Sequence, residues 1–528
     1  MLSQNPVANV IRGRLLLVMI LFVLLAGAAF SGGPPPVAHA ATITVDSATN
    51  AVADDGVCTL REAITAANSD TASGATPGEC PAGSGADNIE LGVGLTYTLD
   101  VVDNSAWGDT GLPAITSPIT INGNGSTIER DELAPDFGIL VVQPDAYLIL
   151  NDVTITGGVA AWGGGIQNLG ALTISNSTIS GNSASSGGGI YSDSIDPVLF
   201  QTILSITGST ISGNSTTGSG GGIYNNFSTL TITGSAIDGN SAGSGGGINN
   251  TNGAVAITET SFTGNSATGN GGGIYNIDSI TITGSTLSGN SADSGGGIFN
   301  QNVTASITNS TFSGNGASTG GGIFNASGAV DLTNVIIANS PSGGDCSGSI
   351  TSLGHNLDSD DTCGLTDTDD LPGADPLLGP LQNNGGATDT HALRRGSPAI
   401  DAADNVSALG TDQRGASRPI GADSDIGAYE YDLCTLVLDV SYIDGIARVE
   451  ATVGTLVPAT KNIWGTLQSK VLNLDSTAIP VTDPPGTGLE FSGPVPDQGV
   501  VAVFATLTTP EDGIICSDFK ILDTGPAP

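Results

Sequence analysis

The chain has 528 residues, of which 78 are glycine and 4% are aromatic, and its 51 acidic and 12 basic residues give a formal net charge of −39. Such a surface repels nucleic acids and anionic membranes, because both bind proteins through clustered Lys and Arg. Much glycine with few aromatic residues disfavours a conventional globular core or a helical protein and indicates thin, turn-rich coils.

Residues 1–40 have the pattern of a secretory signal peptide. Arg12 and Arg14 precede an apolar run at residues 15–30, and Ala38-His39-Ala40 offers a small-x-small cleavage site. The run is shorter than the about 20 residues that a membrane span needs, and an uncleaved N-terminal anchor is the alternative. The sequence therefore predicts a secreted or cell-surface protein with no membrane span in the mature chain. It does not predict an oligomeric state.

The cysteines fall into three local groups, which export makes disulfide candidates. Paired by proximity alone, out of the 15 pairings that six cysteines allow, they are Cys58 with Cys80, Cys346 with Cys363, and Cys434 with Cys516. Metal binding by these cysteines is the weaker alternative, because no C-x-x-C spacing occurs and the chain has only 3 histidines.

A short amphipathic helix is predicted just after the first cysteine. Leu60, Ala63, Ile64 and Ala67 stand at positions i, i+3, i+4 and i+7, which places them on one helical face. The end of a stacked β-structure exposes an open edge and an open core, and a helix there covers both. We therefore assign residues 41–118 to an N-terminal cap and the first turns.

A unit of about 25 residues is repeated within residues 119–340. Each unit holds an alternating apolar pair such as Leu230 and Ile232, then a second apolar segment, then a Gly-Gly-Gly-Ile signature. The second segment supplies Ile179, Ile211, Ile237, Phe262, Leu287, Phe312 and Ile336, and the signature ends at Ile166, Ile190, Ile223, Ile248, Ile274, Ile298 and Ile323. One turn buries its apolar face only against stacked neighbours. The predicted fold is all-β, a right-handed parallel β-helix with three short strands per turn.

One asparagine recurs in each unit at a turn. The column comprises Asn182, Asn214, Asn240, Asn265, Asn290, Asn315 and Asn339. Asn tolerates the left-handed turn conformation, and stacked Asn amides can hydrogen-bond from turn to turn, so we predict a structural role. The longer spacing between Asn182 and Asn214 indicates an inserted surface loop at residues 193–201.

The composition changes after residue 431. The Gly-Gly-Gly signatures stop, and longer alternating runs begin at residues 436–442, 447–453 and 500–507. With a Cys434–Cys516 staple, residues 432–528 are predicted to form a small β-sandwich of immunoglobulin-like character.

Two parts of the chain resemble known bacterial families. Residues 58–68 (CTLREAITAAN), with LPAIT at 112–116 and ITINGNG at 119–125, resemble the CSLREA-type N-terminal region of secreted β-helix proteins, although Thr59 replaces the serine of that motif. The ordered motifs SLGHNL, DPLLGPL, NGG, THAL, GSPAID, DQRG, RP and DIGAYE within residues 352–430 resemble the choice-of-anchor Q domain. The resemblance implies an exported surface protein whose β-helix spans residues 41–431, with residues 341–431 as its choice-of-anchor Q-like part, and it implies no particular reaction.

Catalytic groups are sparse in the repeats. A polysaccharide lyase needs a base and groups that neutralise a sugar carboxylate, yet no Lys or Arg lies between Arg130 and Arg394. Such a site would have to recruit Arg130 with Glu129, or His355 with Arg394. A glycosidase needs two carboxyls about 5 to 10 Å apart. The acids of the repeats stand in different columns, and Asp193 and Asp196 are interpreted as solvated acids of the inserted loop.

Neither a cofactor nor a catalytic residue is assigned from the sequence. Ca²⁺ is the alternative, because hard oxygen ligands suit it and a run of acids contains Asp358, Asp360, Asp361, Asp367, Asp369 and Asp370. A second charged group, Asp412, Arg414, Arg418 and Asp425, is interpreted as a salt-bridge network at a C-terminal cap.

The sequence therefore favours an extracellular or cell-surface β-helix with a non-enzymatic structural or adhesive role. A hydroxyl ladder of Thr173, Ser205, Thr231, Thr281 and Ser306 offers a flat face to glycans or other proteins. The alternatives are a carbohydrate-active enzyme, either a lyase or a glycoside hydrolase, and a purely mechanical spacer.

Overall fold

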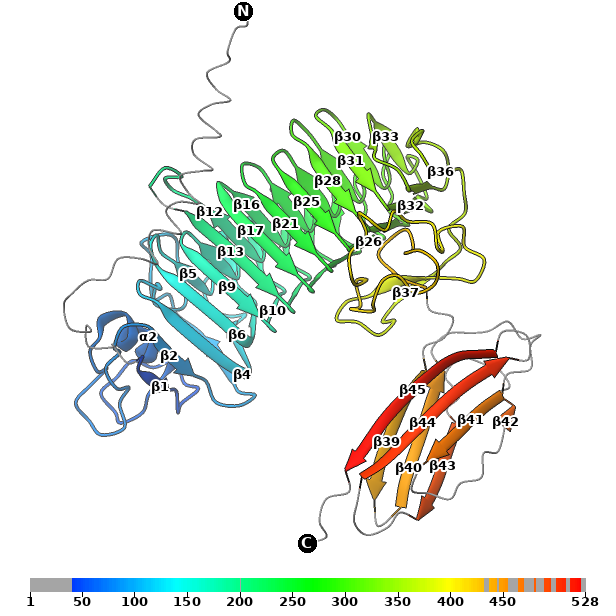
Figure 1. Cartoon of the computed structure of the whole chain (residues 1–528). Helices are drawn as coiled ribbons and strands as arrows, with labels where there is room; N and C mark the ends of the chain where they lie inside the picture. The colour runs from blue at the N-terminus through cyan, green and yellow to red at the C-terminus, as the bar shows by residue number, and fades with distance from the viewer. Residues whose placement is uncertain are drawn as a thin grey trace, which may run out of the picture.

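The computed structural model describes residues 40–199 and 201–431, and beyond them the backbone of the strands between Leu436 and Asp523. The described chain is almost entirely β-structure (Figure 1). Except for Ala40, the predicted signal peptide lies outside the described residues, and so does the proposed Cys434–Cys516 bridge.

A parallel β-solenoid forms the body of the structure, as predicted. Its first stack contains the alternating segments: β1 (Thr42–Thr44), β2 (Asp87–Glu90), β4 (Ile119–Arg130), β6 (Tyr147–Thr156), β9 (Ala171–Ser175), β13 (Thr202–Thr207), β17 (Ser228–Thr233), β21 (Val255–Thr258), β25 (Ile280–Thr283), β28 (Ala305–Thr308), β31 (Val330–Thr333) and β34 (Thr351–Ser352). The second half of β4 also pairs with β3 (Thr96–Leu99).

The second stack follows after a sharp turn. It comprises β10 (Thr178–Ser180), β14 (Thr210–Ser212), β18 (Ala236–Asp238), β22 (Ser261–Thr263), β26 (Thr286–Ser288), β29 (Thr311–Ser313), β32 (Ile336–Ala338), β35 (Leu357–Asp358) and β36 (Leu371–Pro372). In both stacks like residues fall on like residues, for example Ile206 on Ile232 and Ile211 on Ile237, and these four side chains are fully buried. Alternation therefore builds one continuous apolar interior.

The Gly-Gly-Gly-Ile signatures build the third stack. Its strands are β5 (Leu140–Val142), β8 (Ile166–Asn168), β12 (Ile190–Asp193), β16 (Ile223–Asn226), β20 (Ile248–Asn250), β24 (Ile274–Asn276), β27 (Ile298–Asn300), β30 (Ile323–Asn325) and β33 (Cys346–Gly348). The glycines are needed because Gly245 has φ +68 and a Cβ on Gly247 would lie 2.6 Å from the carbonyl oxygen of Gly273. Backbones of successive turns pack directly on one another here.

A fourth, very short stack was not predicted. It contains β7 (Val159–Trp162), β11 (Ser183–Ser186), β15 (Ser215–Thr216), β19 (Ser241–Ala242) and β23 (Ser266–Ala267). Except for β7, which follows Gly158, these strands follow the asparagine of each repeat and consist of Ser, Thr and Ala. The alternation of large apolar residues that marks the other stacks is absent from them.

The asparagine column forms a hydrogen-bonded ladder inside the turns. The side-chain amide of Asn214 donates to Oδ1 of Asn240 at 3.0 Å, and the backbone N–H of Asn214 donates to the same atom. The pattern repeats from Asn182 to Asn315. The left-handed conformation belongs to the preceding glycine, as in Gly239 with φ +60, and not to the asparagine, as the sequence had suggested.

Two members of the predicted columns are shifted by one residue. Phe312 pairs with Ile337, so Ile337 and not Ile336 continues the buried position of the second stack. Ser313 pairs with Ala338, which places Asn339, with φ 60, at the glycine position of the turn. Asn339 is therefore outside the ladder. The sequence places the wrong isoleucine at the inward position because two adjacent apolar residues, Ile336 and Ile337, both fit it.

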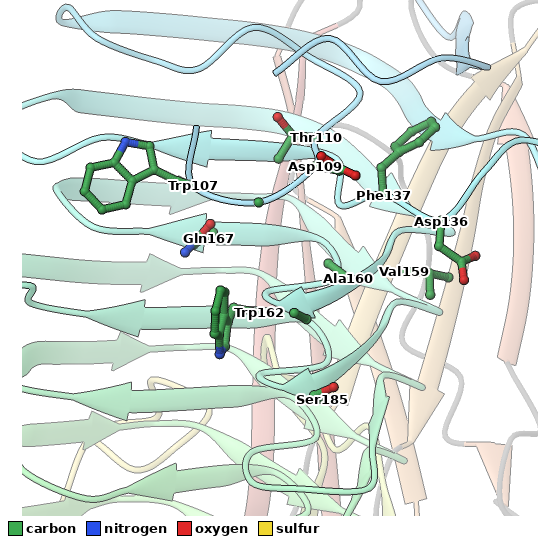
Figure 2. Close-up of a pocket in the computed structure, with 12 residues that line it drawn as sticks. Trp107, Asp109, Thr110, Asp136, Phe137, Val159, Ala160, Trp162, Gln167 and Ser185 are labelled. Carbon is green, nitrogen blue, oxygen red and sulfur yellow. The ribbon is translucent and has the colours of Figure 1, made fainter. Parts of the chain in front are cut away.

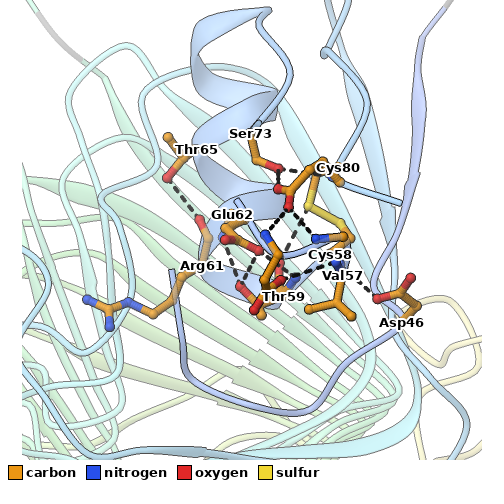
Figure 3. The surroundings of a disulfide bond; sticks show 12 residues. Asp46, Val57, Cys58, Thr59, Arg61, Glu62, Thr65, Ser73 and Cys80 are labelled. Atoms are coloured by element: carbon orange, nitrogen blue, oxygen red, sulfur yellow. Dashed lines mark hydrogen bonds between the residues drawn. A yellow bond between two sulfur atoms is a disulfide. The ribbon is translucent and has the colours of Figure 1, made fainter. Parts of the chain in front are cut away.

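The N-terminal end is covered by helix α2 (Leu60–Ser69), which lies beside β1 and β2 (Figure 1). Its predicted apolar face is buried, and Thr59 with Glu62 forms a capping box at its start. The Cys58–Cys80 disulfide lies beside that cap (Figure 3). The predicted Cys346–Cys363 disulfide is also formed, at the other end of the solenoid.

Residues 376–431, which we call the lateral lobe, turn back along the side of the solenoid. They contain β37 (Leu378–Gln382) and β38 (Thr390–Leu393), which Figure 1 shows beside β26. The lobe covers the outward face of the second stack, so all three residues of β26, β29 and β32 are buried, whereas only the middle residue of β10 and β14 is. The segment predicted to cap the C-terminal end of the solenoid therefore covers the side of the solenoid instead.

Beyond the lobe, the chain forms antiparallel strands. One sheet has the order β39-β40-β43 (Leu436–Ile443, Ile446–Val453, Leu489–Pro494), and the other has the order β42-β41-β44-β45 (Ile479–Pro480, Trp464–Ser469, Val500–Thr509, Gly513–Asp523). Two antiparallel sheets agree with an all-β region, and their packing as a sandwich stays a prediction.

Candidate functional site

A groove runs along the fourth stack. A hollow of about 390 Å³ at its N-terminal end is lined by residues that include Trp107, Asp109, Trp162 and Gln167. A second hollow of about 430 Å³ shares Val159, Ala160 and Ser185 with the first and continues to Ser241. Because the hollows share these residues, they form one groove parallel to the direction in which the turns stack.

Hydroxyl groups form the floor of this groove. Strand pairing places Ser183, Ser215, Ser241 and Ser266 directly above one another, and a β-bridge adds Ser291. We call these residues the serine column. Parallel strands repeat about every 4.8 Å, so the groove offers the same polar group at a regular interval over several turns.

Aromatic side chains border the N-terminal end of the groove. Trp162, at the end of β7, is 50% exposed, and its ring centroid lies 6.5 Å from that of Tyr191 on β12. Tyr191 stacks on Tyr224 at 5.1 Å. Trp107 reaches the groove from the loop before β4, and Figure 2 shows it on the other side of Gln167 from Trp162. The two indoles thus come from segments 55 residues apart in the numbering of the chain.

The aromatic row continues along the outward face of the third stack. Register places Tyr191, Tyr224, Asn249, Tyr275, Phe299 and Phe324 in one column. Tyr275 and Phe299 stack at 5.1 Å. Asn249 interrupts the column, so it consists of one aromatic pair next to the groove and a separate group of three farther along.

Gln167 is a buried polar side chain without a protein partner. Only 6% of the residue is exposed, and its side chain lines the first hollow between the two tryptophans (Figure 2). Among residues 40–199 and 201–431, its amide makes no side-chain hydrogen bond to the protein, and the amide faces the hollow. A ligand in the groove would supply the missing donors and acceptors.

Two carboxylates, Asp109 and Asp136, stand at the same hollow and are both exposed. In the view of Figure 2 they lie on opposite sides of the Phe137 ring. Arg130 packs against the same ring at 6.0 Å, but its guanidinium donates to the carbonyl oxygens of Gly157 and Ala134 at 2.9 Å. Arg130 thus holds the turns together, and among the residues that line the groove there is no basic side chain.

The predicted hydroxyl ladder lies on a different face, that of the first stack. Strand register aligns Thr173, Ser205, Thr231, Thr281 and Ser306, with Ala256 interrupting the column and Asp331 ending it. Tyr147, which is 39% exposed, contacts Thr173 through its hydroxyl at 3.3 Å. Neither of the two hollows of the groove is lined by a residue of this column.

Asp193 differs from its predicted role. It is the last residue of β12, not a solvated loop acid, and it accepts hydrogen bonds from the Tyr191 hydroxyl at 2.7 Å and the Asn226 amide at 2.8 Å. Burial raises its pKa above the ordinary Asp value. Asp196 instead accepts backbone N–H groups of its own loop, so the two carboxylates have separate surroundings and do not act as a pair.

The other residues considered for catalysis are dispersed. His355 hydrogen-bonds the carbonyl oxygen of Ala402 at 2.8 Å and lies 3.8 Å from Asp369. Arg394 is exposed, and Glu129 accepts a hydrogen bond from Thr98 at 3.1 Å. The contacts of His355 and Glu129 join neighbouring segments of the fold. None of these residues lines the groove.

A carboxylate cluster occurs at the C-terminal end of the solenoid. Asp345, Asp358 and Asp360 place carboxylate oxygens within 4.8 Å of one another. Burial raises the pKa of Asp358 to about 7. The carboxylates accept hydrogen bonds from Ser359, Cys363 and Thr362, among others. Asp345 was missed in the sequence because it precedes the acidic run, whereas Asp361, Asp367, Asp369 and Asp370 are outside the cluster. Ca²⁺ binding here stays the alternative to the prediction of no cofactor.

The predicted salt-bridge network lies within the lateral lobe, but Glu430 and not Asp425 is the acidic partner of Arg418. Arg414 pairs with Asp412 at 2.7 Å and lies 3.6 Å from the Tyr429 ring centroid. Arg418 pairs with Glu430 at 3.4 Å and donates to the backbone of residues 425 and 427. The network binds the lobe together and leaves no open site around these arginines, since both side chains are buried.

Comparison with known proteins gives one family match. Residues 176–193 and 259–277, which each contain part of one solenoid turn, match the Chlamydia polymorphic membrane protein repeat. No curated protein and no solved structure matches the chain significantly. Within the part of the chain that the structure describes, no helix is long and apolar enough to cross a membrane. The chain is thus similar to the repeat of a bacterial membrane protein over two short stretches.

Proposed function

We propose that this protein is an exported, non-enzymatic surface protein that binds glycans in the groove along its fourth stack. The observation that carries the proposal is the combination of two tryptophans, the Gln167 amide without a protein partner and a regular serine column in one groove. Binding sites generally combine apolar and aromatic walls with a few polar groups that set orientation. Sugars present both kinds of surface, with C–H faces for the rings and hydroxyls for Ser and Gln.

The regular spacing of the groove favours a polymer as the ligand. A solenoid repeats its surface once per turn, so Ser183, Ser215 and Ser241 present equivalent hydroxyls. A polysaccharide repeats its own hydroxyls and can meet several of them at once. A nucleic acid also repeats, but its phosphates would face an acidic protein without basic groups in the groove.

Export and a surface location are part of the proposal. They rest on the signal-peptide pattern, on the two disulfides, which persist in oxidising compartments, and on the match to a membrane protein repeat. The CSLREA-type and choice-of-anchor Q-like resemblance supports the same location.

The binding proposal is tested with a glycan array and titration calorimetry on the purified chain. Trp162→Ala should weaken binding of the best glycan about tenfold, because buried aromatic contacts dominate interface energies. Tyr147→Ala is the matched control, since Tyr147 is an exposed aromatic residue on the hydroxyl ladder of the first stack. Loss of binding in Tyr147→Ala alone would place the ligand on that ladder. If no glycan binds, only a scaffold or spacer role is left.

Glycoside hydrolysis is the second candidate, favoured by Asp109 and Asp136 at the same hollow. Two carboxyls at a suitable separation can act as acid and base or nucleophile. Incubation with a broad polysaccharide panel tests this reaction. Release of reducing ends that both Asp109→Asn and Asp136→Asn abolish would replace the non-enzymatic proposal, whereas intact polymers with retained binding would support it.

A further inference from the structure

The charges at the aromatic end of the groove have one sign. Asp109 and Asp136 are exposed there, and the nearest candidate cation, Arg130, donates its guanidinium N–H groups to backbone carbonyl oxygens. No Lys or Arg occurs between Arg130 and Arg394, so the turns that continue the groove add none. A uronic acid polymer would bring carboxylates to this surface without a counterion.

A protonated amine, unlike a carboxylate, would find groups of opposite charge at this site. Ammonium groups form charge-assisted hydrogen bonds with carboxylates, and Asp109 and Asp136 offer oxygens on both sides of Phe137 (Figure 2). Trp107 and Trp162 can pack on the sugar rings, and an aromatic face also attracts a nearby cation. The same hollow therefore offers aromatic faces and carboxylates to one oligosaccharide segment.

Gln167 adds a neutral contact between the two indoles. It is 6% exposed and without a protein partner among the described residues, so its amide can donate to and accept from sugar hydroxyls. This contact does not depend on charge. The Gln167 contact favours sugars because they carry hydroxyls, whereas the two carboxylates favour sugars that carry a positive charge.

We infer that the groove is selective for polysaccharides with free amino groups, meaning polymers of a 2-amino sugar that is not N-acetylated. This inference rests on the proposed glycan-binding function and names its ligand class. The amine pairs with Asp109 and Asp136, the rings pack on Trp107 and Trp162, and Gln167 binds a hydroxyl of the same segment.

The test compares three oligosaccharide probes of equal length: glucosamine oligomers with free amines, their fully N-acetylated counterparts, and galacturonic acid oligomers. Calorimetry at low salt should give about tenfold tighter binding of the free amine over the N-acetylated form, because each exposed ion pair contributes at most about fivefold. Added salt should reduce this preference. Gln167→Met should weaken both amino sugars alike.

Two double variants separate a local from a global charge effect. Asp109→Asn/Asp136→Asn should remove the preference for the free amine and leave the N-acetylated form unchanged. Asp278→Asn/Asp293→Asn removes two acids of the repeats that do not line the hollow. This variant should keep the preference for the free amine. Equal losses in both variants would overturn the inference in favour of general attraction to an acidic protein.

The remaining outcomes distinguish the inference from the function on which it rests. If the N-acetylated or uronic acid oligomer binds as tightly as the free amine and Trp162→Ala weakens that binding, the groove binds glycans and the amine inference is wrong. If none of the probes and no glycan on an array binds, the proposed function is itself wrong.

Discussion

The hydroxyl of Thr286 donates a 2.6 Å hydrogen bond to Oε1 of Gln413, which follows it by 127 residues. Both side chains are buried, and the Gln413 amide also donates to Thr388 at 2.8 Å. Nearby, Ser288 contacts His391 at 2.9 Å, and the backbone N–H of Ala428 donates to Thr311 at 3.0 Å. The lateral lobe is thus attached by polar groups that other turns of the second stack leave facing outward.

Gln413→Leu should destabilise the protein by roughly 1 to 3 kcal/mol, because it leaves the buried Thr286 hydroxyl without its acceptor and removes the amide that donates to Thr388. Urea unfolding measures the change. The double variant with Thr286→Val should lose less than the sum of the two single variants, since the two residues interact. Thr281→Val, at an exposed position of β25, is the control. Additive losses would contradict the proposed coupling.

Asn240→Ala should cost on the order of 3 kcal/mol, because several buried groups lose their partners at once. Asn240 accepts from the backbone and side-chain N–H groups of Asn214 and donates to the carbonyl oxygen of Ile211 at 2.9 Å. Asn252→Ala, which removes an exposed asparagine, should change stability by less than about 0.5 kcal/mol. Chemical denaturation of both variants tests the difference, and equal stabilities would show that the ladder is not stabilising.

Removal of the Cys58–Cys80 disulfide should destabilise the N-terminal cap. The bridge closes a loop with a sequence separation of 22 residues, for which chain-entropy reasoning gives about 3 kcal/mol. Hydrogen exchange of Cys58→Ser/Cys80→Ser should show faster exchange in α2 and little change near Cys346–Cys363. Cys346→Ser/Cys363→Ser should show the reverse. Uniform loss of protection in either variant would mean that the solenoid unfolds as one unit.

The lateral lobe should be less stable at neutral than at mildly acidic pH. Burial raises the pKa of Asp425 to about 7, above the about 3.9 of an unfolded Asp. The folded state therefore binds the extra proton, so the stability contribution is fully present below about pH 4 and is lost as the pH rises toward 7. The loss is on the order of 4 kcal/mol.

The pH effect is isolated by comparing wild type with Asp425→Asn in urea unfolding between pH 4 and pH 8. The difference in unfolding free energy should change between pH 4 and about pH 7 and be level above about pH 7. The comparison matters because burial lowers the pKa of His391, which makes stability rise with pH in the acidic range. A difference that does not vary with pH would show that Asp425 has the same pKa folded and unfolded.

Much of the solenoid is predictable because its information is local and repeated. Leu230 and Ile232 alternate with polar residues, and the same spacing recurs turn after turn, so period and inward face follow from the chain itself. The register was wrong where this redundancy ends, at Ile336-Ile337, where two apolar residues adjoin. Ile337 belongs to the solenoid interior, whereas Ile336 packs with Leu357 and Ile426.

The candidate site was less accessible to sequence reasoning. Trp107, Asp109, Asp136, Trp162 and Gln167 come from four segments, and no spacing links them. The available signal was the presence of two of the chain's 3 tryptophans near the start of the repeats. The hydroxyl ladder was found because it repeats, whereas the groove depends on where unrelated loops meet the fourth stack.

The sequence by itself determined the β-solenoid, its period, the capping helix and the two local disulfides, because each depends on residues close together in the chain or on a repeated pattern. The tertiary structure decided the groove, the placement of Gln167 between two indoles and the attachment of the lateral lobe along the second stack. These features depend on contacts between distant, non-repeated segments, whose free energies appear only after the chain has brought them together.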